Sequence, residues 1–345
     1  MKRPSPVPVL ALGIAALAVL TIFGVGQGAA HIAGGKVVAI LGHVVGLRSA
    51  TAFRPWEATI LLDVRMPRVV TGAFVGGGLA LSGAALQALF RNPLADPGVI
   101  GVASGASLGA VAAMYLGLAA AGVWAVPVFA IAGASATAFS VYAIASRGGR
   151  LPMGTLLLAG VALGSLASAL TSLLLSLSLE EYEQGRQTFR WLMGGLEAKT
   201  WGEALLVAPL TLAGAAVVTA SARELDALLL GEMQAASLGV DVPAVRRRLI
   251  FATSVVIGGA VAVSGVIAFV GLVVPHLLRL VVGPSHAVLL PACLVFGAAF
   301  VVGCDLLCRT LVAPEELRLG IMTASLGAPF FLYLLLTRRR EVSIE

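Results

Sequence analysis

Long stretches of this chain carry no charged side chain. Five runs without Asp, Glu, Lys or Arg cover residues 69–90, 97–146, 151–179, 204–222 and 319–337. A helix needs about 20 apolar residues to cross a bilayer, so the second run has room for two spans. The run 249–304 holds Arg279 as its one charge, and its length fits two full spans and a shorter piece broken around Pro275 and Gly283. With an N-terminal span added, the pattern predicts an all-α polytopic membrane protein with about ten transmembrane helices.

The N-terminus opens with two basic residues and a long apolar run. Lys2 and Arg3 precede the run from Val7 to Ala30, which is longer than the apolar part of about 7–15 residues in a secretory signal peptide. We therefore expect a retained first span. Lys and Arg favour the cytoplasmic side of a membrane, and an even number of spans puts both termini on that side. The pattern predicts a multi-pass protein of the bacterial inner membrane with both termini cytoplasmic.

The composition agrees with a bundle of membrane helices. Hydrophobic residues make up 59% of the chain and charged residues 12%, and the mean hydropathy is +1.00, so water is not its main solvent. The net charge of +6 comes from short clusters between apolar runs, which predicts no nucleic-acid partner. Three cysteines without paired spacing are expected to pack in the core: Cys293, Cys304 and Cys308.

Two similar segments occur in the two halves of the chain. GGGLALSG at Gly76–Gly83 resembles GGAVAVSG at Gly258–Gly265. The first copy follows arginines expected outside and the second follows arginines expected inside, so the two copies would cross the membrane in opposite directions. Inverted repeats of this kind are a transporter architecture, with the path between the halves. The expected organisation is one transmembrane domain over residues 1–345, with repeats at about 64–195 and about 247–340.

Six short segments carry most of the information about family. They are VRMPR (64–68), LSGAALQALFRNPLADPGVIGVASGA (81–106), FRWLMGG (189–195), LGEMQAASLGV (230–240), GLVVPHLLRL (271–280) and GIMTASLGAPFF (320–331). In this order they resemble the FecCD/BtuC family of permeases, and the resemblance covers about residues 60–337. It implies a BtuC-like fold and an ATP-binding cassette importer. The permease would move an iron chelate (ferric siderophore or haem) or cobalamin from the periplasm to the cytoplasm.

The resemblance also implies the partners. Permeases of this family work as homodimers with a dimer of cytoplasmic ATPase subunits and a periplasmic substrate-binding protein. The chain contains no GxxxxGK[ST] phosphate-binding loop, so we expect it to be a transport subunit and not an enzyme. We expect it to bind no cofactor, because ATP and Mg²⁺ belong to the partner ATPase. Membrane lipid is the remaining expected partner.

The segment of about residues 223–248 is the one sizeable polar break expected inside the cell. Within it, Gly231–Gly239 combines helix formers with a final glycine, which predicts a short amphipathic helix with a C-terminal stop. In the resembled family this stretch docks into a groove on the ATPase, whereas an ordinary connecting loop is the alternative. By position, the resemblance assigns ATPase coupling to Glu232, Ala235, Ala236, Leu238 and Gly239.

Two further groups of residues take roles from the resemblance. Asn92 and Leu94 follow the second span at the positions of a cytoplasmic gate, although Asn-Pro also starts ordinary turns. Arg65, Arg68 and Arg309 lie at the expected outer ends of spans, against the usual charge bias. In the family, arginines at these positions receive glutamates of the binding protein, so we expect binding-protein docking. Snorkelling of the arginines to lipid phosphate is the alternative.

A few polar residues do not follow the family pattern or a known motif. Arg318 stands where the family usually has proline in Glu-Leu-Pro-Val-Gly. We expect this difference to leave the fold intact, but it means that the family pattern does not identify the transported ligand. His276 is expected to pack rather than to bind a metal. His31 and His43 match no metal-ligand spacing, so the sequence predicts no metal site.

An ion-coupled secondary transporter is the alternative function. It would need ionisable groups at membrane depth. Asp305 is a carboxylate in such a place, but Arg309 follows four residues later on the same helix face, which predicts an ion pair. A membrane enzyme would show clustered His, Cys or carboxylate residues in the spans, and the sequence contains no such cluster.

Overall fold

The computed structural model describes residues 6–28, 32–44, 46–47, 53–93, 95–98, 101–146, 153–178, 182–313 and 315–342. Within these ranges all regular secondary structure is helical. Seven helices are long and apolar enough to cross a membrane, and four shorter apolar helices accompany them. The expected all-α membrane fold is confirmed.

The helices fall into two groups by position. The bundle consists of α1 (Pro6–Gly26), α4 (Met66–Leu89), α5 (Val102–Tyr115), α6 (Ala125–Ala145), α7 (Met153–Ser178), α9 (Trp201–Ala220), α12 (Val242–Ser264), α13 (Val270–Val282), α14 (His286–Thr310) and α15 (Leu319–Val342). Shorter segments are α2 (Gly34–Val44), α3 (Pro55–Thr59), the π-helical turn η2 (Ile60–Arg65), the 3₁₀ turn η3 (Leu118–Ala121), α8 (Tyr182–Leu192), α10 (Ala222–Leu230) and α11 (Glu232–Ser237). In the described residues, the bundle therefore has about the number of helices that the charge-free runs predict.

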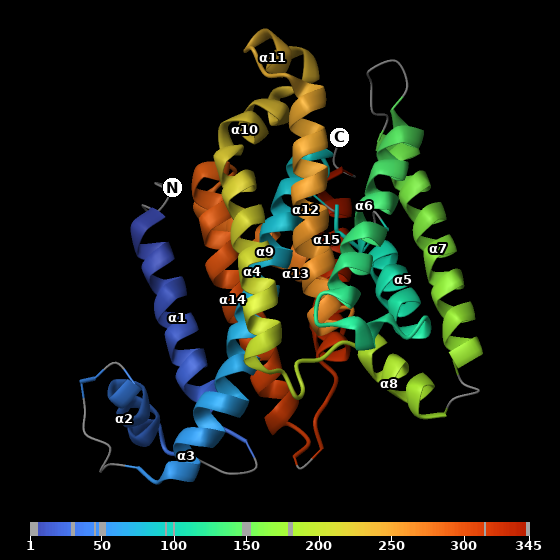
Figure 1. Cartoon of the computed structure of the whole chain (residues 1–345). Coiled ribbons are helices and arrows are strands. Elements are labelled where there is room, and N and C mark those ends of the chain that lie inside the picture. The colour runs from blue at the N-terminus through green and yellow to red at the C-terminus, as the bar shows by residue number, and fades with distance from the viewer. Residues whose placement is uncertain are drawn as a thin grey trace.

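The two ends of the bundle carry different segments (Figure 1). α10 and α11 lie at one end, which we call the α11 end, and α2, α3 and α8 lie at the opposite end, the α3 end. The described part of the chain begins and ends toward the α11 end, at the start of α1 and at the end of α15, as an even number of spans requires. α4 begins at the α3 end and α12 at the α11 end, so the helices with the two similar glycine-rich segments run in opposite directions. The inverted repeat itself stays a prediction.

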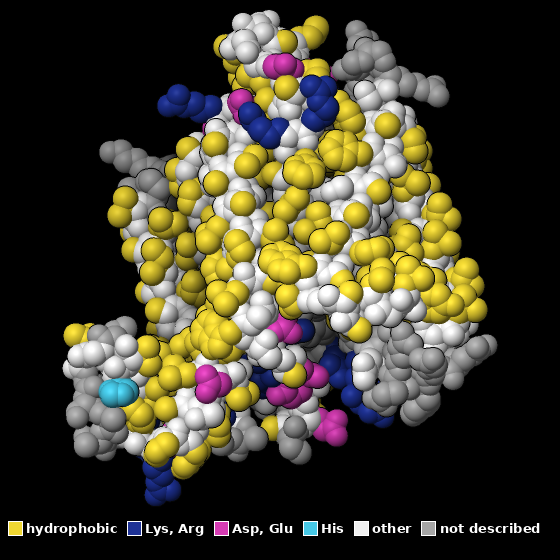
Figure 2. Space-filling view, in the orientation of Figure 1, with side chains coloured by type: hydrophobic (Ala, Val, Ile, Leu, Met, Phe, Trp, Pro, Cys, Tyr) yellow, Lys and Arg dark blue, Asp and Glu magenta, His cyan; other side chains and the backbone are white. Residues whose placement is uncertain are grey.

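Charged side chains avoid the middle of the bundle. Figure 2 shows Lys, Arg, Asp and Glu side chains gathered at the two ends of the visible face, with a broad apolar band between them. The hydrocarbon of a bilayer solvates charge poorly, so a band of this kind is the surface that lipid covers. The chain is a multi-pass membrane protein.

The centre of the bundle is occupied by α4, which packs on α9, α12, α13 and α14. Its backbone contacts that of α14 directly. A Cβ atom on Gly76 would fall 2.2 Å from the carbonyl oxygen of Gly297, and one on Gly297 would fall 2.4 Å from the carbonyl oxygen of Gly76. Small residues permit such close approach of membrane helices. α4 and α14 are therefore tightly joined near the middle of both helices.

The connection between α12 and α13 differs from the prediction in one detail. The chain breaks before Val270, where Phe269 has φ of 67°, and α13 then runs through Pro275 and stops at Gly283. The expected break at Pro275 is wrong, whereas the break at Gly283 is confirmed. Proline lacks the N–H that would bond the carbonyl one turn earlier. The side-chain amide of Gln87 on α4 donates to that carbonyl, of Gly271, at 3.1 Å, which lets the helix continue past the proline.

Candidate functional site

A cluster of charges lies at the α3 end, where α4, α14 and the loop before α15 meet. Nε of Arg68 donates to both carboxylate oxygens of Asp305 at 3.0 and 3.1 Å, and Nη2 donates at 2.8 Å. Arg68 also contacts Glu316, at 3.2 Å from Nη1 and 2.9 Å from Nη2. Arg309 Nη2 lies 3.2 Å from Asp305 Oδ2, which confirms the predicted ion pair. We call Arg65, Arg68, Arg309, Asp305 and Glu316 the α3-end charge cluster.

Two arginines of this cluster also cap α1. The last carbonyls of a helix have no partner within it. Arg65 Nη1 donates to the carbonyls of Val25 and Gly26 at 2.9 Å each, and Arg309 Nη1 donates to the carbonyl of Gly24 at 2.9 Å. A cation at a helix C-terminus is also favoured by the helix dipole. The two guanidiniums therefore attach the end of α1 to α4 and α14.

Access to the surface separates the three arginines. Arg65 is 7% exposed and Arg309 8%, and the side chain of Arg68 is little more exposed at 11%, but its partner Glu316 is 35% exposed and so connects Arg68 to the surface. The sequence predicts an acidic partner from another protein for all three. In the described part of the chain, their guanidiniums already bond to this chain's own carboxylates and carbonyls. Docking stays a prediction, and Arg68 is the arginine best placed for it. Buried against protein, Arg65 and Arg309 are not the lipid-facing side chains that snorkelling requires.

A small pocket of about 120 Å³ gathers charged residues near the start of α15. Arg190, Glu197, Lys199 and Arg318 are among the residues that line it. Arg318 Nη1 donates to Glu197 Oε2 at 2.7 Å, so the arginine at the usual proline position has a partner within the chain. Burial lowers the pKa of Lys199, and the nearby carboxylates of Glu203 and Glu197 act in the opposite direction. The departure from the family pattern adds an ion pair at this position.

At the opposite end, α10 and α11 project beyond the bundle (Figure 1). α11 closes with a Schellman motif, in which the N–H groups of Gly239 and Val240 donate to the carbonyls of Ala236 (2.9 Å) and Ala235 (3.1 Å). This motif needs a left-handed residue just after the helix, and Gly239 has φ of 84°. The predicted short helix with a glycine stop is confirmed.

The five residues assigned to ATPase coupling, on α11 and in the turn that ends it, differ in burial. Ala236, Leu238 and Gly239 are exposed, whereas Ala235 is fully buried. Glu232 forms an ion pair with α12 and so holds the segment in place. Three of the five residues are therefore accessible to a partner, whereas Ala235 and Glu232 pack or pair within the chain.

Another exposed side chain on α11 was not predicted. Met233 is 79% exposed, and Leu238, just after the helix, is 66% exposed. Apolar side chains exposed beyond the lipid band, on a short helix among charged residues, are typical of a surface that another protein covers. A helix of six residues is too short for hydrophobic periodicity to show which of its side chains face outward.

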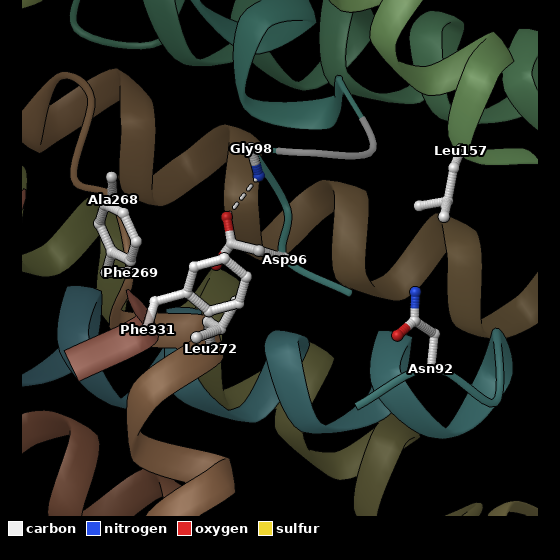
Figure 3. A pocket seen from close by; sticks show the side chains of 8 residues that line it. All are labelled: Asn92, Asp96, Gly98, Leu157, Ala268, Phe269, Leu272 and Phe331. Atoms are coloured by element: carbon white, nitrogen blue, oxygen red, sulfur yellow. Dashed lines mark hydrogen bonds between the residues drawn. The ribbon is translucent and has the colours of Figure 1, made fainter. Parts of the chain in front are cut away.

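A cavity of about 560 Å³ opens where the loop after α4 faces α7, α13 and α15 (Figure 3). Asn92 and Asp96 come from this loop, and aromatic surface is contributed by Phe269, just before α13, and by Phe331 of α15. Asp96 is buried, and its Oδ1 accepts a hydrogen bond from the N–H of Gly98 at 2.8 Å. The predicted gate residue Asn92 thus borders a cavity of the bundle, and Asp96 is a second polar residue there that the sequence analysis did not select.

The described ranges contain no group of three His, Cys, Asp or Glu side chains close enough to hold a metal ion. His276 is buried, and its ring meets that of Phe330 edge-on with 6.1 Å between the ring centroids, in keeping with the predicted packing role. His43 makes an edge contact with Phe53. Leu94 and His31 lie outside the described residues.

Comparison with known proteins assigns the family. The sequence model of the FecCD transport family matches residues 16–337. The chain belongs to the FecCD transport family. The cobalamin import system permease protein of Halobacterium salinarum is 48% identical over 84% of this chain and 76% of that protein. The hemin transport system permease protein of Yersinia pestis is 41% identical over 82% of this chain and 85% of that protein.

Solved structures support the same assignment. A metal-chelate type ABC transporter in an inward-facing conformation superposes with a TM-score of 0.82 and 31% sequence identity. The superposition covers 96% of this chain and 99% of the other. The predicted BtuC-like fold is confirmed. The charge cluster lies at the α3 end and the exposed residues of α11 at the α11 end, so the two candidate sites are separated by the full thickness of the bundle.

Proposed function

We propose that this FecCD-family chain is the membrane permease subunit of an ATP-binding cassette importer for cobalamin or haem. One observation carries this proposal: the apolar side chains of Met233 and Leu238 are exposed at the polar α11 end. The chain has no phosphate-binding loop, so ATP must be hydrolysed by a separate protein. An apolar surface beyond the lipid band is suited to docking such a protein. ATP and Mg²⁺ would be bound by that ATPase and not by this chain.

The α11 end faces the cytoplasm in this proposal. Positive charge near the membrane favours that side, and this end carries Arg223 and the three arginines at the start of α12: Arg246, Arg247 and Arg248. Both chain ends would then be cytoplasmic, in the inner membrane of a bacterium. No nucleic acid takes part, and lipid surrounds the apolar band.

The permease would work as a homodimer. α7 packs on α5, α6 and α8, and large apolar side chains remain uncovered on it, among them Leu158 and Leu166. α7 and α15 border the cavity that holds Asn92. A second copy on this face would turn the cavity into part of a closed path, and Asn92 with Leu94 would then narrow the path on the cytoplasmic side.

An external binding protein would deliver the ligand to the α3 end. The α3-end charge cluster is the candidate docking site, with Arg68 as the cation that the partly exposed Glu316 links to the surface and Arg65 and Arg309 as its buried support. Two relatives are named as permeases for cobalamin and for hemin, which supports a large ring-shaped metal complex as the ligand. A ferric siderophore is the other ligand that the experiment below would detect.

The alternative, an ion-coupled secondary transporter, has little support from the carboxylates. Asp305 is engaged by Arg68 and Arg309 within this chain, so it is not a free carboxylate in an open ion path. The exposed surface of α11 would also have no purpose in a transporter without a motor.

Uptake into proteoliposomes tests this function. The permease is co-purified with its ATPase, reconstituted, and supplied with the binding protein and cobalamin, haem or a ferric siderophore. We expect uptake of cobalamin or haem, and we expect this uptake to require ATP on the side of the membrane to which the ATPase is bound. Uptake that follows an imposed proton gradient without ATP would overturn the proposal, and ATP-driven uptake of the siderophore alone would correct the ligand.

A further inference from the structure

Three pairs of side chains hold α10 and α11 against the bundle. Glu224 of α10 pairs with Arg248 of α12, and Glu232 of α11 pairs with Arg246 of α12 at 2.5 Å. These two pairs join the segment to the helix that follows it directly in the chain. The third pair starts from Asp226 of α10 and reaches α14, 60 residues further on.

Asp226 caps the N-terminus of α14 from outside that helix. Its Oδ1 accepts a hydrogen bond from the backbone N–H of His286 (2.9 Å) and lies 2.6 Å from Nδ1 of the same residue. Its Oδ2 accepts a hydrogen bond from the hydroxyl of Ser285 at 3.4 Å. The side chain of Ser285, the residue before the helix, gives α14 no cap. The first N–H groups of a helix lack partners and favour negative charge. Asp226 therefore supplies the hydrogen-bond acceptor and the negative charge that the N-terminus of α14 does not obtain from Ser285.

The contact is asymmetric in burial. The side chain of His286 is completely buried, whereas that of Asp226 is partly exposed on α10, which lies at the α11 end. α10 also packs on α4 and α14. Because a buried ring in a close-packed interior cannot move without its neighbours, a shift of Asp226 is passed to the first turn of α14.

α14 carries this contact across the membrane. Its 25 residues span roughly 37 Å at 1.5 Å per residue. Near its middle, Gly297 lies against Gly76 of α4. Near its far end, Asp305 pairs with Arg68 of the same α4. One pair of helices therefore connects the cap from Asp226 at the α11 end with the charge cluster at the α3 end.

We propose that Asp226 is a positioning residue that couples movement of α10 and α11 to the α4–α14 pair. This inference rests on the proposed function, because it takes the partner ATPase as the source of the movement. Met233 and Leu238 contact the motor, whereas Asp226 contacts α14 and acts on transport through it. Energetic coupling between distant sites travels through packed elements of this kind. A site-to-site coupling is typically about 5–150-fold, which sets the size of the effect to expect.

The test measures ligand imported per ATP hydrolysed by the complete transporter in proteoliposomes. Asp226→Ala removes the cap, and we expect the ratio to fall at least about fivefold while basal ATP hydrolysis continues. Asp226→Asn retains an oxygen that can accept from the His286 N–H, so it should remain within about twofold of wild type. The matched control is Glu224→Ala, which removes a carboxylate from the same helix but only the pair with Arg248, and it should also remain within about twofold.

A further variant protects the test against misfolding. Asp226→Glu keeps the charge and polarity but moves the carboxylate by one methylene, so we expect the same fall in ratio from a complex that assembles normally. A wild-type ratio in Asp226→Glu or Asp226→Ala would overturn the inference, as would an equal fall in Glu224→Ala. Absence of ATP-driven uptake by the wild-type transporter would instead overturn the proposed function.

Discussion

The carboxylate of Asp305 on α14 and the guanidinium of Arg68 on α4 form a bidentate pair across 237 residues of sequence. The pair links α4 and α14 near the α3 end, and the backbones of the same two helices approach closely at Gly76 and Gly297. Arg309 approaches the carboxylate from its other side. This arrangement makes Asp305 the anion that compensates two buried cations.

Removing Asp305 tests that role. Asp305→Ala leaves two guanidiniums without their carboxylate, and breaking a buried pair in this way costs about 3–5 kcal/mol. Glu316→Ala is the control, because Glu316 also contacts Arg68 but is partly exposed, and such pairs contribute about 0–1 kcal/mol. The measurement is the free energy of unfolding in detergent or bilayer. Equal losses for the two variants would show that Asp305 does not have this role.

Glu316 offers a test of docking that leaves the buried arginines untouched. If an acidic group of the binding protein reaches Arg68, Glu316 competes for it, so Glu316→Gln should accelerate association of the binding protein at low salt. Glu315→Gln is the matched control, since it removes the same charge from the neighbouring position. Steering by the overall field affects both variants alike and weakens with ionic strength. Association rates are measured across a salt series, and identical rates for the two variants would count against docking at Arg68.

The exposed surface of α11 predicts how the ATPase binds. Met233→Glu places a charge in an apolar contact with the ATPase. A loss of about 1.4 kcal/mol of binding free energy weakens the affinity tenfold. We expect at least that loss, whereas Met233→Leu preserves apolar area and should bind like wild type. Affinity of the detergent-solubilised permease for the ATPase is the measurement. Wild-type affinity of Met233→Glu for the ATPase would show that the ATPase does not contact the permease at Met233.

The contact between α4 and α14 predicts a difference between two glycines of one helix. In Gly297→Ala the new Cβ would lie 2.4 Å from the carbonyl oxygen of Gly76, so the helices must separate, at a cost of about 1–3 kcal/mol. In Gly303→Ala the Cβ would meet only the side chain of Leu20 at 3.6 Å, an ordinary contact. This variant should be neutral or gain up to about 1 kcal/mol, since Ala favours helix over Gly. Thermal unfolding of the two variants compares them directly, and equal midpoints would refute the close approach.

Features encoded locally could be predicted from the sequence. Spans follow from charge-free length, since lipid excludes charge from about 20 consecutive residues. The stop of α11 follows from Gly239, because one residue there must be left-handed. The pair of Asp305 with Arg309 follows from a spacing of four on one helix. In each case the physical constraint acts within a few residues or along one continuous segment.

Contacts between distant segments were decided by the tertiary structure alone. The partners of Arg65 are the carbonyls of Val25 and Gly26, which every residue possesses and no sequence pattern marks. A π-helical turn, which departs from the regular α-helical spacing of side chains, ends at Arg65. Likewise, α13 continues past Pro275 because an amide from α4 reaches the carbonyl that the proline leaves without a donor.

The same limit applies to the role of each charge. From the chain alone, Arg65, Arg68 and Arg309 have the pattern of cations at the rim of a membrane protein, and Asp226 is one carboxylate in a polar loop. Whether a charge faces solvent, lipid or a buried partner depends on how helices pack, because burial changes the free energy of a charge by more than its sequence neighbours do. The sequence by itself therefore determined the membrane helices, their number and the family. Packing alone decided that the arginines hold α1 and Asp305, and that Asp226 meets α14.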